Sequence, residues 1–170
     1  MMNETVTKRR DSRPWLLLIA AVIVLLDRLS KLWVDKHVER GHFIAVIPKV
    51  FRISHVFNTG AAFSLFANSI SPVTVRYVLI GFSIVAIVVV LAMIWYAGRG
   101  FSLTGVALAL ILGGAIGNLY DRIAYRYVVD FLEVTIVHYH WPDFNVADSC
   151  IVIGACLLLL EIFRTPAKEA

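Results

Sequence analysis

Charged residues are scarce in this chain, and their scarcity excludes an ordinary water-soluble domain. Of 170 residues, 16% are charged and 59% are hydrophobic, with a mean hydropathy of +0.79. Soluble domains average about 25% charged residues, so this sequence could not cover a water-exposed surface. The net charge of +4 is small and forms no stripe that would bind nucleic acid. The composition therefore predicts an integral membrane protein, with a single domain over residues 1–170.

Cysteine is almost absent, and two familiar catalytic motifs are missing. Cys150 and Cys156 lie in one apolar run, about 9 Å apart along a helix and on different faces, so we expect small buried side chains and no disulfide. There is no His-Glu-x-x-His zinc motif, and His138 and His140 have no suitably placed acid beside them. There is no Gly-x-Ser-x-Gly motif, and Ser64 has no evident base. These absences argue against zinc and serine hydrolases.

Long apolar runs, by contrast, are abundant. A hydrocarbon core about 30 Å thick requires about 20 helical residues. Four runs meet this length, at residues 15–34, 77–97, 101–120 and 145–163. The first run is interrupted by charged residues and lacks a small-residue cleavage site, so we expect an uncleaved anchor rather than a secretory signal. The sequence therefore predicts four transmembrane helices.

The distribution of Lys and Arg predicts the orientation of these helices. With both termini inside, the inner segments (1–14, 98–102 and 164–170) hold seven basic residues in 26, against seven in 65 for the outer segments. Basic residues are enriched in cytoplasmic loops. We therefore expect both termini in the cytoplasm and both long connections outside.

The long outer connections contain β-forming residues. Residues 43–58 and 127–139 are rich in Val, Ile, Phe and Tyr. We expect a turn at Pro48-Lys49 within the first segment and one strand over residues 127–139. Residues 61–68 fit a short amphipathic surface helix, and Ser71 followed by Pro72 fits the start of a helix. The expected fold is an all-α membrane protein of four helices with a small extracytoplasmic β-sheet and a short surface helix.

Polar residues gather at the outer ends of the predicted spans. Ionisable side chains inside a membrane are costly, so each is a functional candidate. The group consists of Asp27, Lys31, Asn118, Asp121, Arg122, Asp130, Asn145 and Asp148. The cytoplasmic half of the spans holds almost no ionisable residue, and this asymmetry predicts a site at the outer face.

Helical spacing sorts part of this group. Asp27 and Lys31 are i,i+4 and can form an ion pair, which a structural role explains at least as well as a direct one. Asn118, Asp121 and Arg122 are spaced i, i+3, i+4 and project together.

Two acids carry the chemical hypothesis, although simpler interpretations stay open for both. Asn145 and Asp148 are spaced as an N-cap and its N3 partner, and Asp130, between apolar strand residues, could face solvent. If the acids meet, one keeps a proton, which provides a base for water and an acid for a peptide carbonyl. The helix dipole at Asp148 favours its ionised form, so we assign the base to Asp148 and the proton to Asp130.

Five segments resemble the bacterial lipoprotein signal peptidases, also called signal peptidase II, a family of membrane aspartic peptidases. In order, they are Asp-Arg-Leu-Ser-Lys at 27–31, Asn-Thr-Gly-Ala-Ala-Phe-Ser at 58–64, Gly-Gly-Ala-Ile-Gly-Asn-Leu-Tyr-Asp-Arg at 113–122, Val-Val-Asp-Phe at 128–131 and Phe-Asn-Val-Ala-Asp-Ser at 144–149. With the four-span layout, the resemblance covers nearly the whole chain.

The resemblance implies specific roles and partners. It implies Asp130 and Asp148 as the catalytic dyad, Asn58, Gly60, Asn118, Arg122, Asn145 and Ala147 as supporting or substrate-holding residues, and Asp27, Lys31 and Asp121 as structural polar residues. The implied reaction removes the signal peptide of a diacylglyceryl-modified prolipoprotein just before its lipidated cysteine, at the extracytoplasmic face of the bacterial inner membrane. No metal or organic cofactor is implied. Membrane lipid and the cyclic peptide inhibitor globomycin are the other implied partners, and a monomer is expected.

One departure from the family is visible, and two rival functions stay open. The family usually has Gln where this chain has Arg28, a charge that could contact lipid headgroups or tune access. A small proton-coupled transporter could use the same acids, but it would require polar residues through the membrane depth, whereas residues 77–97 carry no charge. A non-catalytic receptor or lipid-binding chaperone would keep a cleft without needing two acids.

Overall fold

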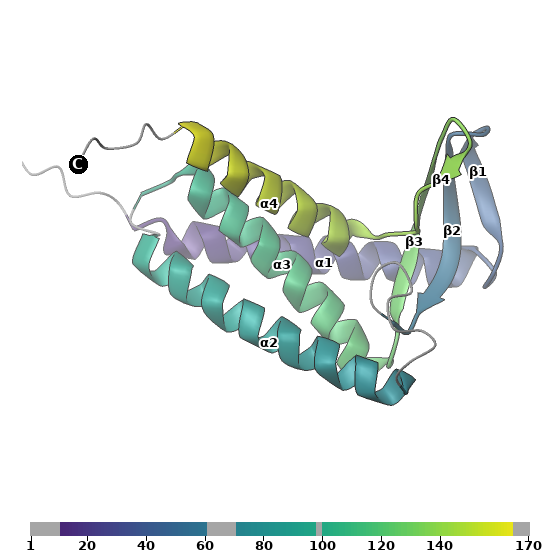
Figure 1. Ribbon diagram of the computed structural model, residues 1–170, viewed down its shortest axis with the longest axis horizontal. Helices are drawn as coiled ribbons and strands as arrows, with labels where there is room; N and C mark the ends of the chain where they lie inside the picture. Colours follow the sequence, from purple (N-terminus) through teal and green to yellow (C-terminus); the bar gives the residue numbers. More distant parts are fainter. Residues whose placement is uncertain (1–10, 61–70, 98–99, 165–170) are drawn as a thin grey trace, which may run out of the picture.

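The structure, a computed structural model, describes residues 11–60, 71–97 and 100–164 as a helical bundle with a small sheet across one end (Figure 1). The helices are α1 (Arg13–His37), α2 (Pro72–Ala97), α3 (Leu103–Ala124) and α4 (Val146–Arg164). The strands are β1 (Phe43–Ile47), β2 (Phe51–Asn58), β3 (Val128–Ile136) and β4 (Tyr139–His140). The fold is therefore mostly helical with a small antiparallel sheet. The surface helix expected at residues 61–68 lies outside the described residues.

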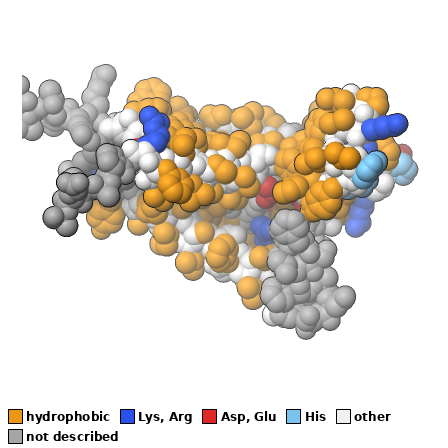
Figure 2. All heavy atoms as spheres, turned by 45° about the horizontal axis from the view of Figure 1, so that its top comes forward, with side chains coloured by type: hydrophobic (Ala, Val, Ile, Leu, Met, Phe, Trp, Pro, Cys, Tyr) orange, Lys and Arg blue, Asp and Glu red, His pale blue; other side chains and the backbone are white. Residues whose placement is uncertain are grey.

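Three of the described helices, α2, α3 and α4, are long and apolar enough to cross a membrane. Helix α1 has 25 residues and sufficient length, but Asp27, Arg28 and Lys31 interrupt its apolar surface. Large apolar side chains such as Phe82 and Ile162 project outward from the bundle. In the face seen in Figure 2, hydrophobic side chains cover much of the helical part. This surface suits contact with lipid.

Helices α2 and α3 each begin directly after a serine. Helix α2 starts at Pro72, as the Ser71-Pro72 pair predicts, five residues before the start of the predicted span. Helix α3 starts after Ser102, whose hydroxyl oxygen accepts a hydrogen bond from the Gly105 amide at 3.1 Å. Three of the four predicted spans were shorter than their helices, because a span is limited by lipid thickness, whereas a helix continues until a cap or turn ends it.

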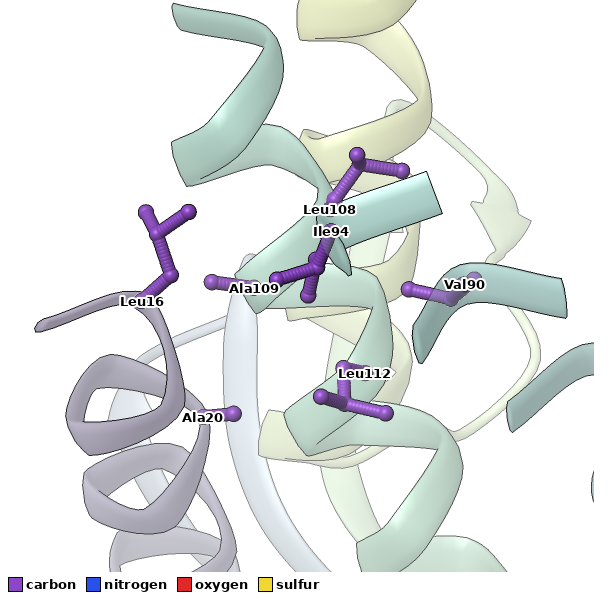
Figure 3. Close-up of a cluster of buried hydrophobic side chains, with 7 residues drawn as sticks. All are labelled: Leu16, Ala20, Val90, Ile94, Leu108, Ala109 and Leu112. Atoms are coloured by element: carbon purple, nitrogen blue, oxygen red, sulfur yellow. The ribbon is translucent and has the colours of Figure 1, made fainter. Parts of the chain in front are cut away.

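Helix α3 forms the centre of the bundle. Its Leu108, Ala109 and Leu112 lie in a buried cluster with Leu16 and Ala20 of α1 and Val90 and Ile94 of α2 (Figure 3). A Cβ atom added at Gly113 would lie 2.8 Å from the Ala20 carbonyl oxygen, and one added at Gly114 would overlap the Ala147 carbonyl oxygen. The missing side chains therefore allow α1 and α4 to approach α3 closely.

The sheet is antiparallel throughout, in the order β1-β2-β3-β4. The turn expected at Pro48-Lys49 is confirmed between β1 and β2. The prediction of one strand over residues 127–139 was wrong, because the chain reverses after Ile136 and His140 pairs with Thr135. Val137 makes this reversal with φ +60°, a conformation that β-branched residues rarely adopt. Alternation of β-forming residues gave no sign of the turn.

Val137 provides a test of this turn. Its side chain is 85% exposed and contributes little packing, whereas its positive φ is strained. Val137→Gly should therefore stabilise the protein by about 1 kcal/mol. Thermal unfolding in detergent would measure the change. Val137→Ala keeps the Cβ atom and should gain less; an equal gain from Ala would show that strain at this φ is not the cause.

Candidate active site

The site forms where β3 meets the start of α4. The backbone amides of Phe131 and Leu132 donate to the Phe144 carbonyl at 3.0 and 2.8 Å, so residue 144 lies beside β3. Asn145 follows directly and is fully buried, and α4 begins at Val146. This pairing brings the strand that carries Asp130 to the first turn of the helix that carries Asp148.

Asn145 and Asp148 cap α4 reciprocally. The Asp148 amide donates to the Asn145 side-chain oxygen at 2.9 Å, and the Asn145 amide donates to Asp148 Oδ2 at 3.3 Å. The helix-start interpretation is thus confirmed. Capping does not account for all contacts of Asp148. Its Oδ1 atom also accepts a hydrogen bond from Asn118 Nδ2 at 2.7 Å, and the side chain is only partly buried.

Asp130 lies in the interior, so the alternative of a solvent-facing acid is wrong. Its exposed fraction is 3%. Asn145 Nδ2 donates to Asp130 Oδ1 at 2.7 Å, and Asn58 Nδ2 donates to Asp130 Oδ2 at 2.9 Å. Asn145 therefore contacts both acids: its side-chain NH₂ binds the Asp130 carboxyl group, and it exchanges capping hydrogen bonds with Asp148.

Electrostatics distinguish the two acids. Burial, followed by the charge of Asp148, raises the pKa of Asp130 to about 7, although the amide groups of Asn58 and Asn145 act in the opposite direction. Asp130 thus holds a proton under conditions in which an ordinary carboxyl group is ionised.

Strand pairing places Asn58 beside Asp130. In the β2–β3 register, Val56 is opposite Asp130, so Asn58 is a diagonal neighbour on the same face. A register shift between Ile53 and Val56 sets this alignment. The Gly60 amide donates to Asn58 Oδ1 at 3.0 Å, which leaves the Asn58 NH₂ group directed at the carboxylate. Gly60 therefore acts by orienting Asn58.

A second group of polar residues lies behind the acids. The Lys31 ammonium is fully buried, 2.7 Å from Asp27 Oδ2 and 2.8 Å from Asp121 Oδ2, and it lies 3.4 Å from Asn118 Oδ1. Asp27 Oδ1 accepts the Ala147 amide at 3.0 Å. The predicted Asp27–Lys31 pair is confirmed, and it connects α1 to α3 and to the start of α4.

Arg122 completes the set of predicted residues. One of its guanidinium nitrogens donates to the Asn118 carbonyl at 3.2 Å, and its charge interacts with Asp148 and Asp130. The structure thus brings the sequence-predicted residues of α1, β2, α3, β3 and α4 into one connected polar cluster. Sequence reasoning did not find the Lys31–Asp121 ion pair or the Asp27–Ala147 hydrogen bond, because no local spacing relates residues that lie 90 and 120 positions apart.

Comparison with known proteins identifies the family. The family model described as signal peptidase (SPase) II matches residues 19–164. The chain belongs to the signal peptidase II family.

Relatives and solved structures agree with this assignment. A lipoprotein signal peptidase from Solibacter usitatus is 42% identical, over 89% of this chain and 92% of its own length. One from Bacillus subtilis is 38% identical, over 89% of this chain and 95% of its own length. One from a Janthinobacterium strain is 43% identical, with 91% of each chain covered. A solved structure described as a bacterial membrane enzyme has a TM-score of 0.79 at 26% identity, over 92% of this chain and 94% of its own.

Membership of signal peptidase II makes this chain a membrane peptidase, and its polar cluster contains two acids in different surroundings. One acid is buried with a raised pKa, and the other is partly exposed at a helix N-terminus, where the dipole favours a negative charge. Asparagine amides hold both acids in fixed orientations. Such a pair can divide general-acid and general-base work between its members.

Proposed function

We propose that this chain is an aspartic endopeptidase that removes the signal peptide from diacylglyceryl-modified prolipoproteins by cleaving before the lipidated cysteine. The names of the relatives support the substrate class. The observation that carries the aspartic mechanism is the Asn145 side chain, which binds Asp130 and caps the helix of Asp148 at the same time.

In the proposed reaction, Asp148 is ionised and Asp130 is protonated. Asp148 takes a proton from water while the water oxygen attacks the scissile carbonyl carbon, and Asp130 donates its proton to the carbonyl oxygen. The tetrahedral diol then collapses: Asp148 gives its proton to the leaving nitrogen, the C–N bond breaks, and Asp130 recovers a proton from the diol. Asn58, Asn118 and Asn145 keep the two carboxyl groups in position throughout.

The raised pKa of Asp130 predicts how the reaction rate depends on pH. Below about 7 Asp130 keeps its proton; as pH rises through that value the acid is lost and kcat/KM should fall. Asn58 stabilises the ionised form, so Asn58→Ala should move the descending limb upward by about one unit, since a hydrogen bond to a charged group is worth about 1.5 kcal/mol. Kinetics across pH 5–9 would measure this. Thr59→Ala is the control and should leave the pH profile unchanged. If the fall of kcat/KM at high pH does not move in Asn58→Ala, Asp130 is not the group whose ionisation causes it.

The membrane placement is part of the proposal. Helix α1 would be the fourth span, with Asp27 and Lys31 buried against α3 rather than in lipid. Both termini would be cytoplasmic, and the acids would lie at the extracytoplasmic face of the bacterial inner membrane. The signal helix and acyl chains of the substrate can then stay in lipid while the scissile bond reaches the polar rim. We take residues 1–170 as one membrane-embedded peptidase domain that acts as a monomer, with globomycin binding at the site of the two acids.

Purified protein and a lipidated precursor test the function directly. The expected result is a product shortened by the signal peptide, with the diacylglyceryl cysteine at its new N-terminus, as read by mass spectrometry, and inhibition of its formation by globomycin. The same precursor without diacylglycerol is the control and should remain intact. Binding of the lipidated precursor without cleavage would favour a chaperone and reject the peptidase.

A further inference from the structure

A partly exposed cation lies on the outward side of α1, away from the two acids. Arg28 follows Asp27, and one residue turns a helix by about 100°, so Arg28 leaves the buried Asp27–Lys31 face. It shares a helix face with Val24, Leu25 and Leu32. Leu25 and Leu32 are 56% and 45% exposed. In a membrane-embedded bundle this face of α1 contacts lipid.

Two tyrosines of the α3 region hold the Arg28 side chain. The guanidinium carbon lies 4.6 Å from the centre of the Tyr125 ring and 5.5 Å from that of Tyr120. The guanidinium also donates to the Tyr125 hydroxyl at 2.5 Å. These contacts fix a long side chain before any ligand arrives, which lowers the entropic cost of binding. The side chain nevertheless remains 27% exposed.

Arg28 forms a longer ion pair with the buried Asp121, but most of its N–H donors stay available. Lys31 holds Asp27 and Asp121 at 2.7 and 2.8 Å, whereas the nearest nitrogen of Arg28 lies 3.8 Å from Asp121, outside hydrogen-bond range. Within the described part of the chain, the Arg28 side chain donates one hydrogen bond, to the Tyr125 hydroxyl. A guanidinium has five N–H donors, so several remain for an anionic oxygen.

Two hollows flank Arg28, and among the residues that the structure describes Arg28 alone lines both. The larger, about 100 Å³, lies between α1 and α3, and Val24, Asp27, Gly117, Tyr120 and Asp121 line it together with Arg28. The smaller, about 30 Å³, is lined by residues near the outer ends, including Leu32, Tyr125 and Tyr127. The larger has room for about three water-sized groups, which suits a short length of acyl chain.

We propose that Arg28, Tyr120 and Tyr125 form a binding site for a membrane phospholipid with a net-negative headgroup. The phosphate accepts hydrogen bonds from Arg28, and an acyl chain enters the hollow between α1 and α3. Zwitterionic lipid binds less well because its cationic group offsets the attraction to Arg28. The site depends on the proposed placement of α1 in the membrane but not on the proposed catalytic chemistry, so either can fail without the other.

Spin-labelled lipids in phosphatidylcholine vesicles test the site. Electron paramagnetic resonance measures how strongly the reconstituted protein immobilises labelled phosphatidylglycerol relative to labelled phosphatidylcholine. We expect a preference of about fivefold for phosphatidylglycerol in the wild type, the effect of one basic residue near a membrane surface. Arg28→Gln should reduce the ratio to near one, and Arg28→Lys should keep part of it. Lys36→Gln, which removes an exposed charge from the same helix, should leave it unchanged.

Several outcomes would overturn the proposal. A ratio that survives in Arg28→Gln, or that falls equally in Lys36→Gln, would show general surface charge rather than a site. Displacement of labelled phosphatidylglycerol by inorganic phosphate would show that a free anion, and not a bilayer lipid, is the ligand. Cleavage of lipidated precursor in phosphatidylcholine vesicles is scored separately, so loss of lipid preference with retained cleavage supports the site and leaves the peptidase function standing.

Discussion

Asp148→Asn and Asp130→Asn should each lower kcat for cleavage of a lipidated precursor by about 10²- to 10⁴-fold, the range that general acid–base catalysis contributes. An amide at position 148 could not accept a proton from water, and an amide at position 130 could not transfer one to the carbonyl oxygen. Both substitutions are nearly isosteric, and each new side-chain amide keeps one oxygen that can accept the hydrogen bond from Asn118 or Asn145. KM should therefore change much less than kcat, which single-turnover assays with the purified variants would separate.

A matched acid elsewhere controls for charge and folding. Glu39→Gln removes a carboxylate that is exposed in the segment between α1 and β1, and it should leave kcat unchanged. Melting temperatures of the two dyad variants should stay near that of the wild type. Full activity in either Asp130→Asn or Asp148→Asn would reject the dyad, because neither acid alone supplies both proton transfers.

Lys31→Met should lower the free energy of unfolding by about 3–5 kcal/mol, the usual cost of removing one member of a buried ion pair. Methionine fills a similar volume, so the loss comes from charge rather than from a cavity. The substitution leaves Asp27 and Asp121 as two buried carboxylates without the ammonium that lies 2.7 and 2.8 Å from them. Reversible unfolding in mixed detergent would measure the change.

Two further variants test whether the buried charges cause this loss. Lys36→Met makes the same change at an exposed position of α1 and should alter stability by less than about 0.5 kcal/mol. Asp27→Asn combined with Lys31→Met removes one of the two stranded charges and should recover part of the loss. If Lys31→Met proves as stable as Lys36→Met, the Asp27–Lys31–Asp121 cluster does not support the fold.

The parts of the fold that sequence predicted rest on local periodicity. The helices, the Ser71-Pro72 start and the Asp27–Lys31 pair all follow from spacings within a few residues, and each is present. The pairing of Asn145 with Asp148 follows in the same way from N-cap chemistry. The sequence could not predict the reversal at Val137, since a β-branched residue at positive φ contradicts the usual turn preferences.

The candidate site shows the same division between local and distant relations. The motif resemblance indicated the residues that gather, but it did not indicate their contacts. That Asn58 reaches Asp130 depends on a strand register with an irregularity between Ile53 and Val56, which no hydrophobic alternation encodes. That Asp148 lies beside Asn118 depends on how closely α4 approaches Gly114 of α3. Packing at this scale is decided by three-dimensional fit rather than by sequence spacing.

The interlocked start of α4 has a consequence for biosynthesis. Asp27 accepts a hydrogen bond from the Ala147 amide, and Asp130 accepts one from the Asn145 side chain. Both contacts can form only after the ribosome has produced more than 140 residues. Until α4 has formed, Asp130 has no contact with the Asn145 side chain, and Asp148 is not yet part of a helix. If the two acids are the catalytic pair, as proposed, a nascent chain that carries only α1 to β3 is inactive, and activity begins when the last hydrophobic segment is inserted.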